Sequence, residues 1–503
     1  PPRSTPSNSS AASDVYKRQL IILFIIFASA LWLRSFPARF NEIQALDPFF
    51  FYRIGLELMQ NNWHLGIDML RYHPAGIDTL QYHYLLPIYL PAFVYTILTS
   101  IGLKIHYLNF AIMWPAVLGA LAVIPMYFLG KEIFGRKAGL FAAFFLSTIP
   151  AFITRTSAGF FEKEPIAGVF IVGSACFFVR ALKRGSWLYG TLAGSCLAIT
   201  SLAWGGVQYV YMLFDGFLAM VFVANLVVVL LDYLFGGFSK FLDTLKVYMG
   251  MDMIKAFMPT MLLGTLVQQL FARHIPISNV SIIASFVLLG MLLIRYGTER
   301  FRLVKPEYIH YVVPSMVMIL VSGSLVGAMF SDSMANNVKQ ITELLTFSKS
   351  VIGTTVAENA PGNWNNILST TGTGYVTAVA PQLGSVAPYL SLWILMFLGA
   401  GLLVYRFFRT REWIMLLPVI WLFSAIVGIF YFVRLIFLIG PPAALSGGIF
   451  LAWVVERMER VKALDRGIKH LSTSLFRIKL SHVVAGIIVS LAVSYTHLTL
   501  PTN

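Results

Sequence analysis

The sequence predicts an all-α membrane protein that crosses the bilayer many times. Of its 503 residues, 58% are hydrophobic and only 12% are charged, about half the ~25% that a soluble domain carries. The mean hydropathy is +0.76, and many apolar blocks approach the ~20 residues that span a bilayer as a helix. A soluble chain this apolar could not cover its surface with polar groups, so a cytosolic enzyme, a disordered tail and a fibrous protein are excluded.

The order of the charged loops predicts which apolar runs cross the membrane. Six loops, the first at 131–137 and the last at 457–479, hold 23 of the 37 Lys and Arg residues, whereas the segments between them hold 11. Such an excess marks the cytoplasmic side. The two sets alternate strictly only if the run at 84–103, broken by Pro87 and Pro91, lies at the membrane interface. About thirteen spans remain, with the N-terminus in the cytoplasm: 19–36, 108–130, 138–153, 165–182, 187–203, 206–231, 254–272, 279–294, 308–330, 385–405, 412–430, 435–455 and 480–493.

Both ends of the chain differ from the rest in composition. The stretches SAASDVYKRQ and VSYTHLTLPT, close to the two ends, resemble translated adapter sequence. We therefore expect a non-native tail at 1–18, a membrane domain at 19–493 and a non-native tail at 494–503, with the native chain truncated at both ends. An alternative for the first run is a signal peptide that is cleaved after Ala28-Ser29-Ala30.

Acidic residues mark three predicted outer loops, at about 37–107, 154–164 and 331–384. They are Asp47 in LDPFFFYR, Glu162 and Glu164 in TRTSAGFFEKEP, and Glu358 in TTVAEN. We expect Pro48 to keep Asp47 out of helical geometry. Oxygen donors from separate loops suit Mg²⁺ or Mn²⁺, and such an ion could neutralise a leaving phosphate. The alternative is that these acids are solvated and pair with Arg53, Arg155 or Lys163.

These motifs resemble the catalytic subunit of oligosaccharyltransferases, the AglB-type enzyme of archaea and its bacterial and eukaryotic relatives. The resemblance covers the membrane domain, with Glu162 where the family usually has Asp. The family's WWDYG motif lies in a globular domain after the last span, and no WWD occurs here, so we expect the chain to end before that domain and to be inactive alone. The matching segments are Asp47-Pro48 to Tyr52-Arg53, Thr154 to Glu164, Thr355-Val356-Ala357-Glu358 and Val433-Arg434-Leu435.

The resemblance implies a fold of the GT-C glycosyltransferase class and an inverting transfer of an oligosaccharide from a lipid diphosphate, such as a dolichol carrier, to Asn in Asn-X-Ser/Thr. It implies that Asp47, Glu162 and Glu164 bind Mn²⁺ or Mg²⁺, with Arg155 supporting them. Asp47 and Glu358 would bind the acceptor amide, and Arg434 the lipid diphosphate.

The expected partners are the lipid-linked donor, the acceptor polypeptide and membrane lipid. The net charge of +15 is assigned to cytoplasmic loops, so no nucleic acid is expected. The resemblance implies an enzyme of the plasma membrane, which we expect to act as a single subunit with its site on the outer face.

Two other functions stay open at this point. One is a different polyprenyl-phosphate sugar transferase, and the other is a secondary transporter, which would carry acids at the membrane midplane and inverted repeats. Asp215 lies inside a predicted span without an evident partner, and its role is unknown. In the loop at 331–384 we expect a gate, with Trp364 as a latch and Pro361-Gly362 as a hinge.

Overall fold

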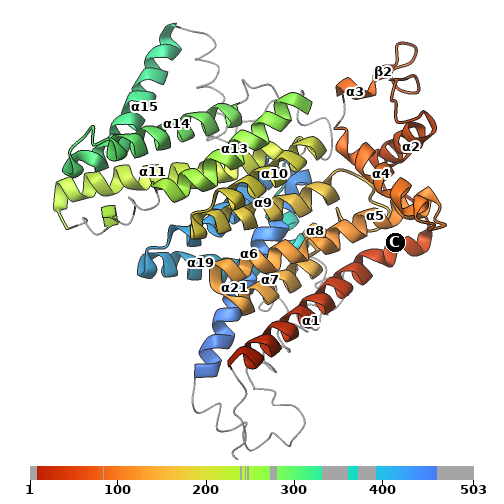
Figure 1. Cartoon of the computed structure of the whole chain (residues 1–503), viewed down its shortest axis with the longest axis horizontal. Helices are drawn as coiled ribbons and strands as arrows, with labels where there is room; N and C mark the ends of the chain where they lie inside the picture. Colours follow the sequence, from red (N-terminus) through yellow and green to blue (C-terminus); the bar gives the residue numbers. More distant parts are fainter. Residues whose placement is uncertain are drawn as a thin grey trace, which may run out of the picture.

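The chain is almost entirely helical. The structure is a computed structural model that describes residues 8–82, 84–237, 241–243, 245, 249–271, 280–330, 361–371 and 392–460. Within these ranges the only sheet is a two-stranded antiparallel ladder, β1 (Ile67–Asp68) and β2 (Ile77–Asp78), with Ile67 opposite Asp78. Long helices lie side by side in one bundle, and the segment from α2 to α4, with the ladder, sits together at one end of it (Figure 1).

The described part of the chain is divided into long helices and shorter helical turns. In chain order they are α1 (Asn8–Ser35), η1 (Phe36–Phe40), α2 (Asp47–Gln60), α3 (Thr79–Tyr82), α4 (Leu86–Ser100), α5 (Tyr107–Leu121), α6 (Val123–Phe134), α7 (Arg136–Thr148), α8 (Pro150–Ile153), α9 (Glu164–Arg184), α10 (Trp187–Ala203), α11 (Val207–Phe235), α13 (Met251–Phe271), α14 (Val280–Arg300), η2 (Pro306–Tyr311), α15 (Val312–Phe330), α17 (Trp364–Thr370), α19 (Leu392–Thr410), η6 (Trp413–Leu416), α20 (Leu417–Tyr431), η7 (Val433–Ile439) and α21 (Gly440–Arg460).

The multi-span character predicted from the sequence is confirmed. Among the described residues, eight helical segments are long and apolar enough to cross a membrane, and each coincides with a predicted span. The number thirteen stays a prediction, because the other described runs form shorter or less apolar helices and the run at 480–493 lies outside the described residues. The eight segments are Lys17–Phe40, Tyr107–Phe134, Glu164–Arg184, Val207–Phe235, Ser281–Arg300, Leu392–Thr410, Trp413–Tyr431 and Val433–Glu459.

The run at 84–103 forms α4, which has 15 residues. At ~1.5 Å per residue such a helix is roughly 22 Å long, less than the ~30 Å hydrocarbon core of a bilayer. It packs against α2 and α5, beyond the end of α1. Its length agrees with a helix that does not cross, and its position at the membrane interface stays a prediction.

The predicted span at 138–153 is wrong as a single helix. The chain breaks at Ile149, between α7 and α8, because Pro150 has no N–H to continue the backbone ladder. The break leads directly into the acidic segment that ends at Glu164, where α9 begins. The acidic segment therefore connects α8 to the first turn of α9, both of which are largely buried.

Close approach of helices is made possible by small residues, as is common between spanning helices. A Cβ at Gly399 in α19 would lie 1.9 Å from the carbonyl oxygen of Ser446 in α21, so these two backbones touch. Between α9 and α10, the Sγ of Cys196 lies 3.2 Å from the Cβ position of Gly173. Cys176 and Cys196 are both buried and not bridged, in agreement with the packing role expected of apolar-run cysteines.

Candidate active site

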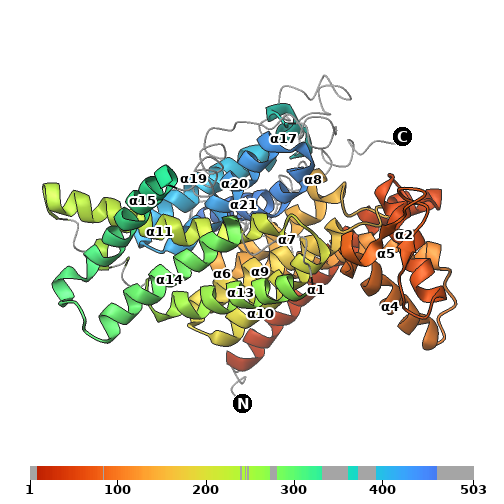
Figure 2. The same ribbon diagram turned by 90° about the horizontal axis from the view of Figure 1, so that it is seen from above.

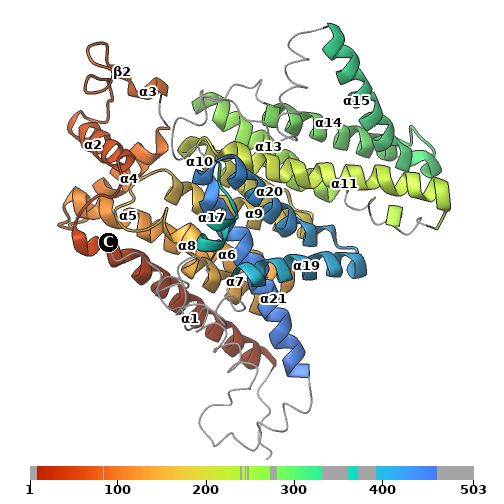
Figure 3. The same cartoon turned by 180° about the vertical axis from the view of Figure 1, so that it is seen from behind.

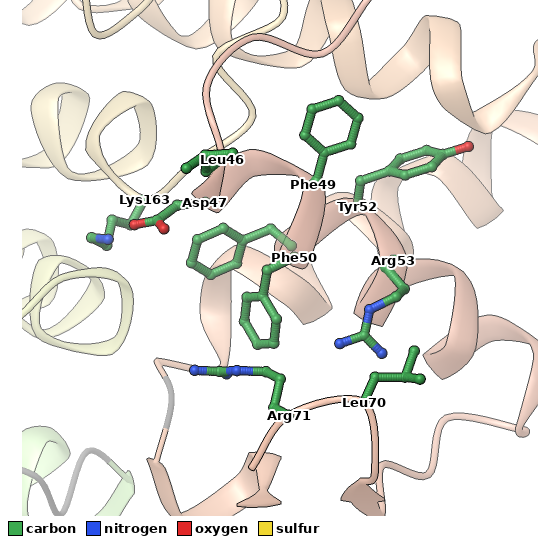
Figure 4. Close-up of a pocket in the computed structure, with 10 residues that line it drawn as sticks. Leu46, Asp47, Phe49, Phe50, Tyr52, Arg53, Leu70, Arg71 and Lys163 are labelled. Carbon is green, nitrogen blue, oxygen red and sulfur yellow. The ribbon is translucent and has the colours of Figure 1, made fainter. Parts of the chain in front are cut away.

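Asp47 stands at the mouth of a cavity at the end of the bundle that carries α2. It is exposed and is the first residue of α2. The prediction that Pro48 keeps it out of a helix is wrong, because a proline is tolerated in the first helical turn, where N–H groups have no partner in the helix. The cavity has a volume of about 630 Å³ (Figure 4), and its walls are Leu46, Asp47, Phe49, Phe50, Phe51, Tyr52, Arg53, Leu70, Arg71 and Lys163.

The second acidic segment meets the first around Lys163. Glu162 and Glu164 are 7% and 8% exposed, and the Nζ of Lys163 donates to Oε1 of Glu162 at 2.5 Å. Burial opposes the charge on Lys163, but the carboxylates of Glu164, Glu162 and Asp47 outweigh it and raise the pKa of Lys163 above its ordinary value. In Figure 4, Asp47 and Lys163 lie next to each other on one side of the cavity. The fold thus brings both predicted acidic segments to one ammonium group.

The three carboxylates have the chemistry of a site for a hard divalent cation. Oε2 of Glu164 is buried and has no hydrogen-bond partner within the described part of the chain, so it can accept a cation. The described residues do not, however, contain three His, Cys, Asp or Glu side chains already gathered closely enough to hold a metal. The donor set fits Mg²⁺ or Mn²⁺ in kind, and the coordination itself stays a prediction.

Arg434 approaches the same place from the other end of the chain. It is exposed, in η7 ahead of α21. Burial raises the pKa of Tyr84, and the positive charges of Lys163 and Arg434 partly offset this rise, so both cations lie near its hydroxyl. A Cβ at Gly205 would be 2.2 Å from that hydroxyl, which shows how closely Tyr84 packs on the turn between α10 and α11. Tyr84 is thus within the electrostatic reach of both Lys163 and Arg434.

Arg155 lies beside the acidic segment, and its supporting role stays a prediction. It is half-buried, and its guanidinium carbon lies 5.1 Å from the centre of the Phe160 ring. Its positive charge acts on the carboxyl group of Glu164. Arg155 is not among the residues that line the cavity.

Glu358 lies outside the described residues, whereas the segment just after it is placed. The N–H of Gly362 donates to the carbonyl oxygen of Ile429 at 2.9 Å. Trp364 is 51% exposed and meets the Phe430 ring edge-on at 5.3 Å between centres. α17 thus rests on the end of α20, beside α8 (Figures 2 and 3). Trp364 thus contacts the end of α20, while its role as a latch and the gating stay predictions.

Two arginines also line the cavity, Arg53 on the side away from Lys163 and Arg71 along the lower edge of the view (Figure 4). Arg53 donates two hydrogen bonds to Asp68, at 3.1 and 2.5 Å. Although burial acts in the other direction, the bond to Arg53 and the charges of Arg53 and Arg71 lower the pKa of Asp68. The guanidinium carbons of Arg71 and Arg53 lie 4.7 and 6.0 Å from the centre of the Phe50 ring.

Sequence reasoning overlooked several of these partners. Asp215 does have one, because Oγ of Ser285 in α14 lies 2.9 Å from each of its carboxylate oxygens. From the sequence, Lys163 was named only as one possible ion-pair partner of the acids, and Tyr84 belongs to none of the matching motifs. Arg34 was counted as a charge of an outer loop but is completely buried. Its only signal was its place in the apolar run ALWLRSF.

The family model and the curated relatives that match this chain name the same family. The family model described as "Oligosaccharyl transferase STT3, N-terminal" matches residues 19–280. The dolichyl-diphosphooligosaccharide–protein glycosyltransferase subunit STT3 of Saccharomyces cerevisiae is 28% identical over 212 residues, which cover 41% of this chain and 30% of that protein. The corresponding subunit of Caenorhabditis elegans is 25% identical over 217 residues, which cover 41% of this chain and 28% of that protein.

Solved structures give the same fold. The Archaeoglobus fulgidus oligosaccharyltransferase in the apo form superposes with a TM-score of 0.69 and 18% identity, over 95% of this chain and 55% of that one. The AglB enzyme of that organism, in complex with an inhibitory peptide and a dolichol-phosphate, superposes with a TM-score of 0.66 and 19% identity, again over 95% of this chain and 55% of that one. The chain spans about half the length of the archaeal enzyme and under a third of the yeast one.

Proposed function

We propose, since the chain belongs to the STT3 family of oligosaccharyl transferases, that it is the membrane part of an enzyme of protein N-glycosylation. The enzyme would transfer an oligosaccharide from a lipid diphosphate, of the dolichol type named for its relatives, to Asn in Asn-X-Ser/Thr. The observation that carries the proposal is the meeting of Asp47, Glu162 and Glu164 around Lys163, beside an open cavity.

The acceptor side of the reaction is assigned to Asp47. The nitrogen of an asparagine amide is a poor nucleophile, because its lone pair is delocalised into the carbonyl group. Asp47 is exposed at the cavity and can accept an N–H of that amide, and Glu358 would accept the other. Two such bonds favour a twisted amide whose nitrogen attacks the anomeric carbon opposite the leaving diphosphate, which inverts that centre. A cavity of about 630 Å³ is in the ~300–1,000 Å³ range of small-molecule sites.

The donor side is assigned to Arg434. A guanidinium can make two parallel hydrogen bonds to phosphate oxygens, and it keeps its charge at any physiological pH. Arg434 is exposed, and its charge reaches Tyr84, next to Lys163. A diphosphate held by Arg434 would therefore lie close to the acidic cluster.

A divalent ion, Mn²⁺ or Mg²⁺, would supply electrostatic stabilisation of the diphosphate as it leaves. Asp47, Glu162 and Glu164 are the residues that would hold it, since their charges all act on Lys163 and Oε2 of Glu164 has no hydrogen-bond partner among the described residues. Arg155 would keep Glu164 in place through its charge.

The charge pattern of the loops supports an orientation with the N-terminus in the cytoplasm and the acidic cluster on the outer face of the plasma membrane. The substrates would then be a lipid-linked donor in that leaflet and an extended polypeptide outside the cell. Action as a single catalytic subunit is part of this proposal, whereas the curated relatives are named as subunits of their enzymes.

The test joins this chain to the remaining C-terminal segment of the Archaeoglobus fulgidus relative and reconstitutes the chimera in liposomes. Dolichol-linked oligosaccharide and an Asn-X-Thr peptide are added with Mn²⁺, and glycopeptide is measured by mass spectrometry. We expect transfer by the chimera and none by the chain alone. Asp47→Asn should lower the rate at least about 100-fold, the scale of losing a central electrostatic group.

Glu57→Gln is the matched control, since Glu57 is also an acid of α2 but only makes a 3.8 Å contact with Arg53. It should keep nearly full activity. Transfer by Asp47→Asn at the unaltered rate, or transfer of sugar to an acceptor other than the peptide, would refute the proposal.

A further inference from the structure

Arg34, near the end of α1, is the most deeply buried charge close to the acidic segments. It is 0% exposed. Its hydrogen bonds within the described part of the chain go to three backbone carbonyls and one hydroxyl: Ala30 O at 3.2 Å, Ser147 O at 2.9 Å, Leu146 O at 3.2 Å and Thr156 Oγ1 at 2.9 Å. A buried guanidinium is expensive unless its donors are satisfied, so this arrangement has a structural cause.

The break at Pro150 creates two of these acceptors. In a continuous helix the carbonyl of Leu146 would accept from residue 150, but proline has no N–H to donate. The carbonyl of Ser147 also loses its helical partner, because the chain turns at Ile149. Arg34 donates to both oxygens, and its positive charge lies at the negative end of α7.

The third contact reaches the turn that precedes the acidic segment. Oγ1 of Thr156 accepts from Nε of Arg34 and donates to the carbonyl of Phe152 at 2.7 Å. The backbone takes part too, since the N–H of Ala158 donates to the carbonyl oxygen of Arg34 at 2.8 Å. A Cβ at Gly119 would lie 2.7 Å from Nε of Arg34, so α5 closes over this contact.

The same turn holds the chain that leads to Asp47. The N–H of Gln44 donates to the carbonyl oxygen of Gly159 at 2.9 Å, and the N–H of Gly159 donates to Ile112 at 2.8 Å. Gly159 has φ +87°, and a Cβ there would be 2.8 Å from the carbonyl oxygen of Glu42. The turn at 156–159 is thus bonded on one side to Arg34 and on the other to the segment before Asp47.

We propose that Arg34 is a positioning residue for the acidic cluster. It fixes the turn at 156–159 and thereby sets the distance between Asp47, which follows Gln44, and Glu162, which follows Gly159. This inference rests on the proposed function for its consequence, the affinity for a divalent ion, but the mechanical coupling of the two segments can be measured without it.

Lysine at this position keeps the charge but cannot reproduce the contacts. A guanidinium donates from a rigid planar fork in several directions, whereas an ammonium is a compact point charge on a flexible stem. In Arg34→Lys the bonds to the end of α7 and to Thr156 cannot all be kept. Arg295→Lys is the matched control, because Arg295 is also 0% exposed but donates within α14 to Glu299 at 2.8 Å.

The experiment measures two quantities on the purified chain in nanodiscs. Hydrogen exchange followed by mass spectrometry reports the peptides 41–47 and 154–163, and titration with Mn²⁺ alone, followed by electron paramagnetic resonance, reports metal affinity. For Arg34→Lys we expect faster exchange in both peptides together and about 10–100-fold weaker Mn²⁺ binding, the usual scale for residues that hold metal ligands in place. Arg295→Lys should change neither quantity.

Thr156 provides a second route in case Arg34→Lys does not fold. Thr156→Val removes the hydroxyl at nearly constant volume and should act in the same direction, while Thr156→Ser keeps the hydroxyl and should bind Mn²⁺ like the unaltered chain. A lower melting temperature with unchanged exchange in both peptides and unchanged Mn²⁺ affinity would show a purely structural arginine and overturn the inference.

The two proposals fail in different ways. If the unaltered chain, and Asp47→Asn with it, shows no saturable Mn²⁺ binding, the metal part of the proposed function is wrong. The exchange of the two peptides then decides alone whether Arg34 couples them.

Discussion

Replacing Gly159 by alanine tests whether the turn at 156–159 is as constrained as its geometry indicates. The backbone at Gly159 has φ +87°, and the new Cβ would lie 2.8 Å from the carbonyl oxygen of Glu42 and 3.0 Å from Cγ of Gln44. A non-glycine residue at such a φ costs about 1–2 kcal/mol. Crowding against backbone that cannot move adds about 1–3 kcal/mol, as overpacking does elsewhere. The sum is a destabilisation of about 2–5 kcal/mol for Gly159→Ala.

Gly135 separates the two contributions. It has φ +100° and ψ 178°, a conformation that few residues other than glycine adopt, but a Cβ there has nothing within 4 Å, so Gly135→Ala should cost only the backbone part, about 1–3 kcal/mol. Unfolding of both variants and of the unaltered chain is compared by denaturant titration in the same detergent, with Mn²⁺ binding as a second readout. Only Gly159→Ala should weaken Mn²⁺ binding. Equal stability losses in the two variants, or normal Mn²⁺ binding by Gly159→Ala, would refute the reasoning.

Two further predictions concern the walls of the site. Because the pKa of Asp68 is lowered in the folded state, its contribution to stability is present above the ordinary Asp pKa of about 3.9 and is lost as the pH falls through the lowered value. After correction for the intrinsic pH dependence of amide exchange, the protection of the β1–β2 segment should therefore fall in acid, and Asp68→Asn should make that protection low and independent of pH in that range; a pH response of the protection that persists in the variant would contradict this. A Cβ at Gly362 would lie 2.6 Å from the carbonyl oxygen of Ile429, so Gly362→Ala should release α17 and expose 361–371 to limited proteolysis. Gly401→Ala is the control and should not increase cleavage, because a Cβ at Gly401 has nothing within 4 Å. Equal cleavage of the two variants would show that α17 is not held there.

The positions of the spans and of the acidic segments could be predicted because they depend on local properties. An apolar run of sufficient length forms a buried helix wherever it lies in the chain, and all eight long apolar helical segments coincide with predicted runs. The motif containing Asp47 and the segment from Thr154 to Glu164 were placed near helix ends by the same runs. The resemblance to the oligosaccharyltransferase family, based on these motifs, is confirmed by the family model over residues 19–280.

What the sequence could not show are contacts between distant segments. Arg34 and Thr156 are 122 positions apart, and nothing in either neighbourhood states that one donates to the other. Pro150 was read as part of a span because its apolar flanks match a helix, although the missing N–H ends α7. Pro48 was misread in the opposite sense, since the bias it exerts on Asp47 was outweighed by the ease with which a first helical turn accepts proline.

The place of Lys163 between two glutamates follows from the electrostatics of the cluster. Glu162 and Glu164 are both more than nine-tenths buried, so a neighbouring cation stabilises the charged forms of their carboxylates. Lys163 is brought to the cluster by the same turn that brings the acids, and its ammonium is already bonded to Glu162. If a divalent ion binds to the same carboxylates, as proposed, its affinity would depend partly on how readily Lys163 gives up that bond. Charge balance in the folded chain and the proposed metal binding would then share the segment Glu162 to Glu164, which we propose is positioned by Arg34.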